Sequence, residues 1–596
     1  MAEPPTGRWR ARQWREGAAL AAVLLVAAIL RLWRLEDNGF GTAYYAAGVR
    51  SMLQGFWLFF YNAFDPAGFI SLDKPPLAFW IQTAFASVLG YDGWTIHLPQ
   101  ALAGIASVGL LYRLVRQPFG VAAGLCAALL LALMPIAVAV DRSNNTDSWL
   151  VFFLLLAAAT ALRGRGLSLV AAMALLGLAF NVKMLAALVC GPALLAGWLF
   201  ASPLDWRRRL GWMAAAGITL VVVSLAWAAA FDLTPKDLRP YAGSSHDNSM
   251  LELIVIHNGL ERFVRPPRTP PAPAQAAAPA PRFELYDSVP VGPLRLAHPT
   301  LAAQFAWTLP LAVLGAVLGW RRRRASVALW SVWALTYGIV FSAAGGIFHA
   351  YYLSALASPL AALAGIGCFE LWRRGSGHLA LGLGVTALWQ GYIAGAALGW
   401  DATWIGFPLV ALAASVAAVW RAKRPPALIG AIALLVLPAM WALSAVFAPG
   451  SLTLPSSSLA RWLGIDDGRG PLLSRSYRPL TDDPKLHAFL RDHRGAAPFL
   501  LAAPNALLAA PVIIQTGQPV MAFGGFFGDD PVMSVDDFAK RVEQGEVRFV
   551  VLSANRRMRD FERWVRAHGK PVDPDLWRSL PPEPRRTIAL YDLAPR

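Results

Sequence analysis

Long apolar stretches recur along the whole chain, and they constrain its fold more than any other feature of the sequence. Each runs for about 18 to 22 residues, the length that a helix needs to cross roughly 30 Å of hydrocarbon. Hydrophobic residues fill 56% of the 596 positions, so the chain is not an ordinary soluble protein. We expect about thirteen membrane-spanning helices. They begin near Gly17, His97, Phe119, Thr146, Gly166, Met184, Leu210, Ala303, Ala325, Tyr351, His378, Ala402 and Pro426.

The basic residues indicate how these helices are oriented. Arginine or lysine clusters occur at every second predicted loop, which is typical of cytoplasmic loops. The clusters lie at 8–15, 113–116, 163–165, 207–209, 321–324, 373–374 and 421–424. The first stretch has no small-residue cleavage site, so we expect a retained span with a cytoplasmic N-terminus. The net charge of +17 is then mostly a topology signal. Because the basic residues flank spans rather than share one face, nucleic-acid binding is not expected.

The polar parts of the chain are predicted to lie together on the outer side. Residues 1–450 form the membrane domain, with long outer loops at 35–96 and 231–300. The first loop contains a segment at 42–60 with the periodicity of a helix lying in the membrane interface. In the second, the proline- and alanine-rich segment 266–281 is expected to be an extended, mobile linker.

The last part of the chain, 451–596, differs in character. Strand-like runs (PFLLAAP, PVIIQT, VRFVVLS, TIALYDL) alternate with helical ones (DDPKLHAFLRDH, VDDFAKRVEQ, RDFERWVRAH), which indicates a small α/β domain. An odd number of spans places this domain outside. Its segment GGFFGDD is either a glycine-rich turn that binds polar groups of a ligand or a plain connection between a strand and a helix.

No metal or cofactor motif is present in the sequence. There is no HExxH or CxxC pattern, no Walker A motif and no dinucleotide fingerprint. Cys126, Cys190 and Cys368 lie inside apolar stretches and have no metal-ligand spacing. We therefore predict no metal site and no required cofactor.

The segment SLDKPPLAFW places Asp73 and Lys74 directly before two prolines. Prolines fit the first turn of a helix, and a carboxylate is favoured at that end of the helix dipole. An ammonium group at the membrane interface can bind a lipid phosphate. The alternative is an ordinary helix start with a lysine that reaches toward the lipid surface.

Further polar side chains cluster at outer ends of the predicted spans. Each cluster also has an ordinary explanation, namely a helix cap, a lysine anchor or a belt of interfacial tyrosines. Their common location favours a site for a lipid phosphate with a many-hydroxyl head group. Lysine and arginine would bind the phosphate, asparagine and aspartate the hydroxyls, and aromatic rings the sugar faces. The residues are Arg142, Asn144, Asn145, Asp147, Lys183, Asp247, Asn248, Asn258, Arg262, His349, Tyr351 and Tyr352.

Seven ordered motifs resemble one bacterial branch of the GT-C glycosyltransferases over nearly the whole chain. Members of this branch are usually called "putative mannosyltransferases", and they are related to protein O-mannosyltransferases and lipid A aminoarabinose transferases. The motifs are RLEDNGFGTAYYAAGVRSML, SLDKPPLAFW, DRSNNTDSWL, GLAFNVKML, DNSMLELIVIHNGLERF, HAYYLSALASP and VMAFGGFFGDDPVMSVDDF. The resemblance implies a mostly α, GT-C-type membrane fold with an outer C-terminal α/β domain.

The resemblance also implies a reaction. A sugar, hexose or pentose, passes with inversion from a polyprenyl-phosphate donor to a glycolipid, lipopolysaccharide, polymer or protein of the cell envelope. The enzyme would act at the outer face of the bacterial inner membrane. Some relatives use a divalent cation, but nothing in this sequence fixes ligands for one. Competing hypotheses are a transporter or flippase of polyprenyl-linked sugars, and a catalytically weakened envelope scaffold.

Individual roles follow from matching positions. Lys74 matches the lysine that contacts the donor phosphate. Asp147 matches an acidic residue of the second outer loop. Lys183 and Tyr351 match positions that line the donor cavity. Arg142 and Arg262 are candidates for offsetting charge on the departing phosphate. We expect Lys74, Asp147, Lys183 and Tyr351 to converge on one outer cavity.

One departure from the superfamily concerns the catalytic base. The superfamily usually carries a carboxylate in the first outer loop, where this chain has Gly41, Thr42 and Ala43. The acids nearest to that place are Glu36, Asp37 and Asp73. We assign the base to Asp37 or Asp73 and include Asp147 among the catalytic residues. The alternative is an acceptor that is acidic enough to need little help from a base.

Overall fold

The computed structural model describes residues 6–263, 289–421, 424–465, 480–553, 558–579 and 588–594. The predicted linker 266–281 lies outside these ranges. The chain forms two compact units. The first comprises Met1–Asn38, His97–Ser224 and Arg262–Arg475, and the second Gly39–Ile96, Leu225–Glu261 and Ser476–Arg596. The second unit therefore contains much of both predicted outer loops together with the C-terminal segment.

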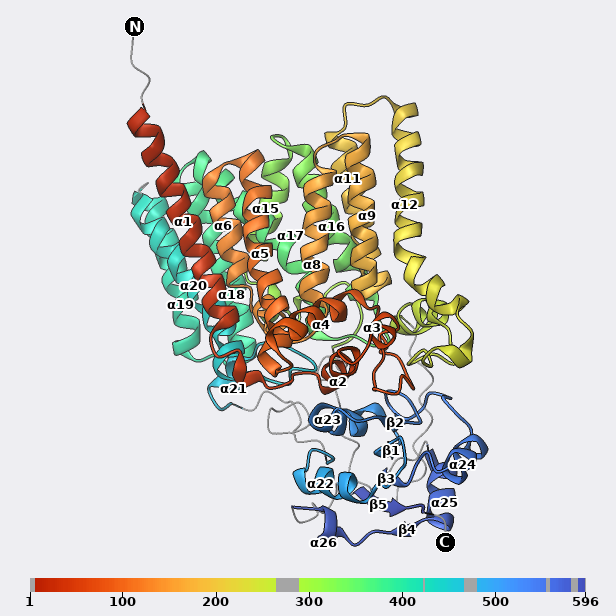
Figure 1. The fold of residues 1–596 in the computed structure, drawn as a ribbon. Coiled ribbons are helices and arrows are strands. Elements are labelled where there is room, and N and C mark those ends of the chain that lie inside the picture. The colour runs from red at the N-terminus through yellow and green to blue at the C-terminus, as the bar shows by residue number, and fades with distance from the viewer. Residues whose placement is uncertain are drawn as a thin grey trace. The chain divides into compact units, whose positions relative to one another are not determined.

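The first unit is a bundle of long apolar helices that run side by side (Figure 1). Its elements are α1 (Thr6–Leu32), α5 (Gly93–Phe119), α6 (Val121–Ala132), α7 (Pro135–Asp141), α8 (Asp147–Ala161), α9 (Gly166–Lys183), α10 (Leu185–Leu188), α11 (Gly191–Ala201), α12 (Trp206–Leu233), α14 (Pro299–Phe305), α15 (Leu309–Trp320), α16 (Arg324–Ala343), α17 (Ser354–Arg374), α18 (Ser376–Leu398), α19 (Ala402–Arg421), α20 (Arg424–Phe447) and α21 (Leu459–Trp462). Two of the unit boundaries fall within α5 and α12.

Most predicted span starts lie close to the start of one of these helices. Within the described residues, nine helices are long and apolar enough to cross a membrane, or up to eleven if each of two bent pairs counts as one span. The bent pairs are α6 with α7 and α14 with α15. The count of thirteen is not confirmed, because α8 and the segment Leu185–Ala201 are each shorter than 18 residues.

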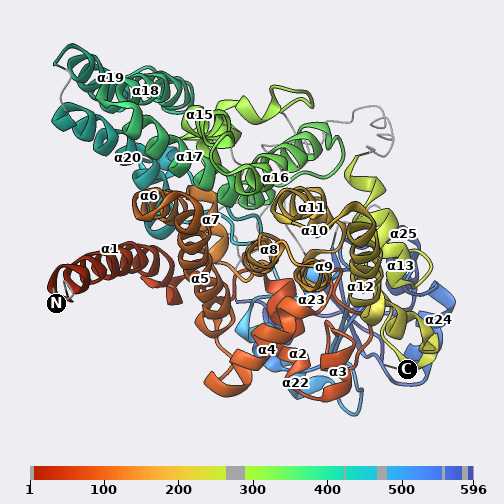
Figure 2. The ribbon, with the colours of Figure 1, turned by 90° about the horizontal axis from the view of Figure 1, so that it is seen from above.

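Small residues allow α17 to pack at the centre of the bundle, and Figure 2 shows it among α6, α15 and α16. A Cβ atom at Gly315 of α15 would lie 1.8 Å from the carbonyl oxygen of Leu363, and one at Gly367 would lie 2.2 Å from that of Leu311. Backbones therefore approach at distances that only glycine permits, which is a common way of packing helices in membranes.

The second unit contains a five-stranded sheet with the order β2-β1-β3-β5-β4. Its strands are β1 (Leu501–Ala503), β2 (Val520–Ala522), β3 (Phe549–Ser553), β4 (Lys570–Pro571) and β5 (Ile588–Asp592). β1 is parallel to β2 and β3, whereas β5 is antiparallel to β3 and β4. Its helices are α2 (Ala43–Met52), α3 (Phe56–Phe60), α4 (Leu77–Leu89), α13 (Met250–Glu252), α22 (Pro484–His493), α23 (Ala506–Thr516), α24 (Val535–Glu543), α25 (Arg559–His568) and α26 (Pro574–Trp577).

The two faces of this sheet have different neighbours. Alternate strand residues point to opposite faces. Leu501, Ala503 and Val551 belong to a core shared with α22, α23 and the first outer loop, including Tyr44 and Phe64. The other face packs against α24 and α25. The first outer loop thus supplies one layer of the α/β unit.

Two local predictions for this unit were wrong. PVIIQT was predicted as a strand, but it forms the C-terminal part of helix α23. Asn505 caps the start of that helix by accepting a hydrogen bond from the Leu508 amide. The segment 42–60 is not one interfacial helix. It is divided into α2 and α3 at Gly55, and α2 is buried within the second unit.

Candidate functional site

The first unit brings Asp147 and Lys183 into a buried ion pair. Asp147 is the first residue of α8 and Lys183 is the last residue of α9. The Lys183 Nζ atom lies 2.6 Å from each Asp147 carboxylate oxygen. The side chains are 11% and 1% exposed. Thr146 makes no capping bond with its side chain. Because burying two charges is costly, such a pair in a membrane bundle indicates a functional site.

Aromatic rings enclose the ammonium group of this pair. Lys183 Nζ lies 4.6 Å from the ring centroid of Tyr351 and 4.3 Å from that of Tyr352, within the range of cation–π attraction. His349 stacks on Tyr351 at 5.1 Å between centroids. Arg262 donates a 2.8 Å hydrogen bond to the Tyr352 hydroxyl. We name Asp147, Lys183, Arg262, His349, Tyr351 and Tyr352 the lysine cage.

The turn before α8 supports the lysine cage. The Asn145 Oδ1 atom accepts a 3.4 Å hydrogen bond from the Asp147 amide, and Asn144 is fully buried. The Arg142 guanidinium donates to carbonyl oxygens at the end of α1, including that of Trp33 at 2.8 Å. This arrangement favours a role for Arg142 in capping the C-terminal end of α1.

Sequence reasoning missed a second buried ion pair in the bundle. Arg31 Nε donates to Asp141 Oδ2 at 2.8 Å, and both side chains are buried. Beside them lies a cavity of about 20 Å³, also lined by Asp147, Ser148 and Ser354. A cavity of this size holds about one water molecule. A charged residue inside the first apolar stretch was the available signal.

Asp73 and Lys74 form the corresponding pair of the second unit. The Lys74 Nζ atom lies 2.7 Å from Asp73 Oδ2, and both side chains are buried. The Tyr44 hydroxyl oxygen accepts a 3.1 Å bond from the Asp73 amide, while Asn62 donates to the Lys74 carbonyl oxygen at 2.8 Å. The helix α4 begins directly after Pro75 and Pro76, as expected for prolines at a helix start.

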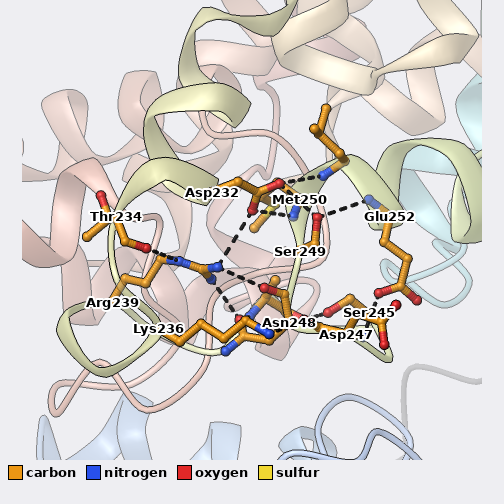
Figure 3. Close-up of polar contacts among 12 residues, drawn as sticks. Asp232, Thr234, Lys236, Arg239, Ser245, Asp247, Asn248, Ser249, Met250 and Glu252 are labelled. Atoms are coloured by element: carbon orange, nitrogen blue, oxygen red, sulfur yellow. Dashed lines mark hydrogen bonds and ion pairs between the residues drawn. The ribbon is translucent and has the colours of Figure 1, made fainter.

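The second outer loop is held by an internal polar network (Figure 3). Arg239 donates to the Asn248 Oδ1 atom at 2.7 Å, and Asp232 accepts bonds from the Met250 and Leu251 amides. Burial opposes ionisation of Glu252, but hydrogen bonds from Asp247 and His246 outweigh it and lower its pKa.

Two further predicted residues make local contacts. The Asn258 amide group donates to the Leu253 carbonyl oxygen at 3.2 Å. Asp37 lies 2.5 Å from Arg34 in an exposed ion pair of the first unit. Of the four side chains expected to converge, Asp147, Lys183 and Tyr351 do so, whereas Lys74 belongs to the other unit and its convergence stays a prediction.

Similar proteins are known for both parts of the chain. Residues 73–227 match the family described as dolichyl-phosphate-mannose-protein mannosyltransferase. Residues 486–568 match "Putative mannosyltransferase YkcB-like, C-terminal". "Putative mannosyltransferase YycA" of Bacillus subtilis (strain 168) is 33% identical, over 94% of this chain and 95% of its own length. "Putative mannosyltransferase YkcB" of the same organism is 32% identical, over 94% and 92%.

Solved structures share the fold. ArnT from Cupriavidus metallidurans bound to undecaprenyl phosphate gives a TM-score of 0.56 at 16% identity, covering 97% of this chain and 98% of ArnT. The apo form of ArnT gives 0.55, covering 98% and 100%.

Together these findings define a multi-pass membrane glycosyltransferase of the GT-C superfamily, similar to mannosyltransferases. Within that class, the chain belongs to the family of the two Bacillus subtilis mannosyltransferases. The resemblance carried by the seven motifs is confirmed, as is the mostly helical GT-C-type fold with its C-terminal strands.

Proposed function

We propose that this protein transfers a sugar from a polyprenyl-phosphate donor to an acceptor of the cell envelope, with inversion. The observation that carries the proposal is the lysine cage, in which a buried ammonium group lies between a carboxylate and two tyrosine rings. Aromatic faces suit a sugar or a lipid tail, and the ammonium suits a phosphate. The undecaprenyl phosphate bound to ArnT supports a lipid carrier of this class.

The chemistry requires two things of the side chains. An acceptor oxygen attacks C1 of the sugar while the bond from C1 to the phosphate oxygen breaks. A carboxylate takes the acceptor proton, and cations offset the charge that develops on the departing polyprenyl phosphate. Lys74 and Lys183 are the cations assigned to that phosphate, and Asp147 orients Lys183.

Each lysine needs its carboxylate partner. A buried ammonium group without a counter-charge tends to lose its proton. Asp73, 2.7 Å from Lys74, and Asp147, 2.6 Å from Lys183, favour the charged form that a phosphate requires. In both pairs, the lysine can therefore bind an incoming anion as a cation.

The proposal places the protein in a bacterial inner membrane with the second unit outside. The arginine clusters support this orientation, because they flank spans on the side opposite to the outer loops. Single cysteines at the exposed positions Lys540 and Arg208 should be labelled by a membrane-impermeant thiol reagent from outside and inside, respectively.

Purified full-length protein in liposomes tests the reaction. We expect it to release undecaprenyl phosphate from labelled undecaprenyl-phosphate mannose or another undecaprenyl-phosphate sugar. Lys74→Ala should reduce this release by about 100-fold or more, because the charge on the leaving group is no longer offset. Lys540→Ala, which removes an exposed lysine of α24, is the matched control. Undiminished release by Lys74→Ala would refute the role of Lys74.

A further inference from the structure

The segment GGFFGDD forms a turn built around the carboxylate of Asp530. Its Oδ2 atom accepts a hydrogen bond from the Phe526 amide at 3.3 Å. Gly525 has φ +70°, and a Cβ atom there would lie 1.9 Å from Asp530 Oδ2. Glycine at 525 is therefore required both by the backbone conformation and by the position of this carboxylate. A plain connection between a strand and a helix would not need this arrangement.

The turn lies against the second outer loop. Asp530 Oδ2 also accepts a 2.8 Å hydrogen bond from the Ser244 amide. The neighbouring Gly243 amide donates to Ser71 Oγ at 3.2 Å, two residues before Asp73. A Cβ atom at Gly243 would lie 2.4 Å from the Ser71 carbonyl oxygen. Segments from both outer loops and from the C-terminal domain thus meet within the second unit.

The turn also lies against the start of α2. The Phe526 ring packs on Tyr44 with 4.6 Å between centroids. The Tyr44 hydroxyl accepts a hydrogen bond from the Asp73 amide, so Tyr44 lies between the Asp530 turn and the Asp73–Lys74 pair. Tyr44 follows Ala43, which belongs to the segment where the superfamily usually has its first-loop carboxylate. The C-terminal domain therefore brings a carboxylate toward the place where the first loop lacks one.

Asp530 has the properties of a base. Burial, together with the negative charges of Asp529 and Asp73, raises the pKa of Asp530 to about 6, despite two hydrogen bonds from backbone amides. A base of this strength is ionised at neutral pH and still accepts a proton readily. Its side chain is half-buried, and within the described residues its Oδ1 atom accepts no hydrogen bond. By contrast, Asp37 and Asp73 are each bound to a cation.

On the basis of the proposed function, we propose that Asp530 is the general base that accepts the proton of the attacking acceptor hydroxyl. The acceptor O–H bond breaks, its oxygen forms the bond to C1, and the bond from C1 to the phosphate oxygen breaks. The proton moves to the Asp530 carboxylate, and the electron pair leaves with polyprenyl phosphate. The outer α/β domain is then a part of the catalytic machinery.

Asp530→Asn tests this assignment, with Asp536→Asn, which changes an exposed carboxylate of α24, as the matched control. An asparagine retains an oxygen that can accept the hydrogen bonds from the Ser244 and Phe526 amides, so the fold should persist. We expect Asp530→Asn to transfer sugar about 100-fold more slowly. Binding of undecaprenyl phosphate and the melting temperature should stay near wild type, and Asp530→Glu should recover part of the rate. Gly525→Ala should lose as much activity as Asp530→Asn, because its Cβ atom displaces the carboxylate.

The pH dependence separates a base from a structural contact. Wild-type transfer should fall as the pH drops through about 6, the pKa of Asp530, and Asp530→Asn should lose this dependence. Asp530→Asn with the rate and pH profile of Asp536→Asn would overturn the assignment, while an active wild type would leave the proposed function intact. A wild type that cleaves no polyprenyl-phosphate sugar would overturn both.

Discussion

The two buried lysine–aspartate pairs of this protein are built in different ways. Asp147 and Lys183 lie 36 residues apart and meet because the start of α8 lies beside the end of α9. Asp73 and Lys74 are neighbours in sequence, and the loop around them is held by Tyr44 and Asn62. A lysine that binds an anion can therefore be positioned either by helix packing or by hydrogen bonds within a loop. The two pairs should respond differently to mutation.

The largest effect on stability should come from breaking the helix-built pair. Asp147→Ala leaves Lys183 buried without its carboxylate, which costs about 3–5 kcal/mol of unfolding free energy. The double variant Asp147→Leu/Lys183→Met should regain most of that stability but no sugar transfer. Thermal unfolding in detergent, together with the donor-cleavage assay, measures both. Equal melting temperatures for wild type and Asp147→Ala would show that the pair does not hold α8 and α9 together.

The stability of the first outer loop, which holds Asp73 and Lys74, should instead depend on pH. Burial raises the pKa of Asp65 to about 7, although the Ala67, Phe69 and Ile70 amides donate to its carboxylate. An unfolded aspartate titrates near pKa 3.9. Because the folded pKa is the higher one, the stabilising contribution of Asp65 is complete below about pH 4 and is lost as the pH rises toward 7.

Asp65→Asn is the matching variant. It should be less stable than wild type at pH 5, because one amide donor loses its acceptor, and this difference should narrow by pH 8. Melting curves at both pH values give the comparison. A stability difference that is independent of pH would contradict the raised pKa of Asp65.

The smallest effect should come from the rim of the lysine cage. Tyr352→Phe removes the hydroxyl that accepts the Arg262 bond but keeps the ring 4.3 Å from Lys183. We expect a rise in KM for the donor of about 3- to 10-fold, which corresponds to one hydrogen bond of roughly 0.5–1.5 kcal/mol. Tyr352→Ala removes the ring as well and should weaken donor binding further. Identical kinetics for both variants would show that the ring contributes nothing.

The sequence predicted well those features that depend on local patterns. Apolar length identified the helices of the bundle, whereas the orientation inferred from the basic clusters stays a prediction. Asp147, Lys183 and Tyr351 were predicted because several polar clusters share the same predicted side of the spans and because these residues match positions of the GT-C motifs. Helix α23 was missed, because a short run of β-branched residues fits a buried helix as well as a strand.

Other contacts between distant segments were not predicted. Nothing local to Arg31 shows that it faces Asp141, and nothing in GGFFGDD shows that its last residue lies beside the second outer loop. Arg142 was read as a phosphate ligand, but its donors reach the carbonyl oxygens that end α1. Main-chain acceptors leave no signal in the sequence, so this use of an arginine cannot be read from it.

The composition of the second unit has a consequence for when the protein becomes active. Its core joins Tyr44 and Phe64 of the first outer loop to Leu501 and Ile513, which are translated after all the long apolar helices. Until that later segment has emerged, Tyr44 and Phe64 contact each other but lack the part of this core that the segment supplies. A half-made chain should therefore be inactive, since the core around the first outer loop is complete only when the C-terminal segment packs onto it.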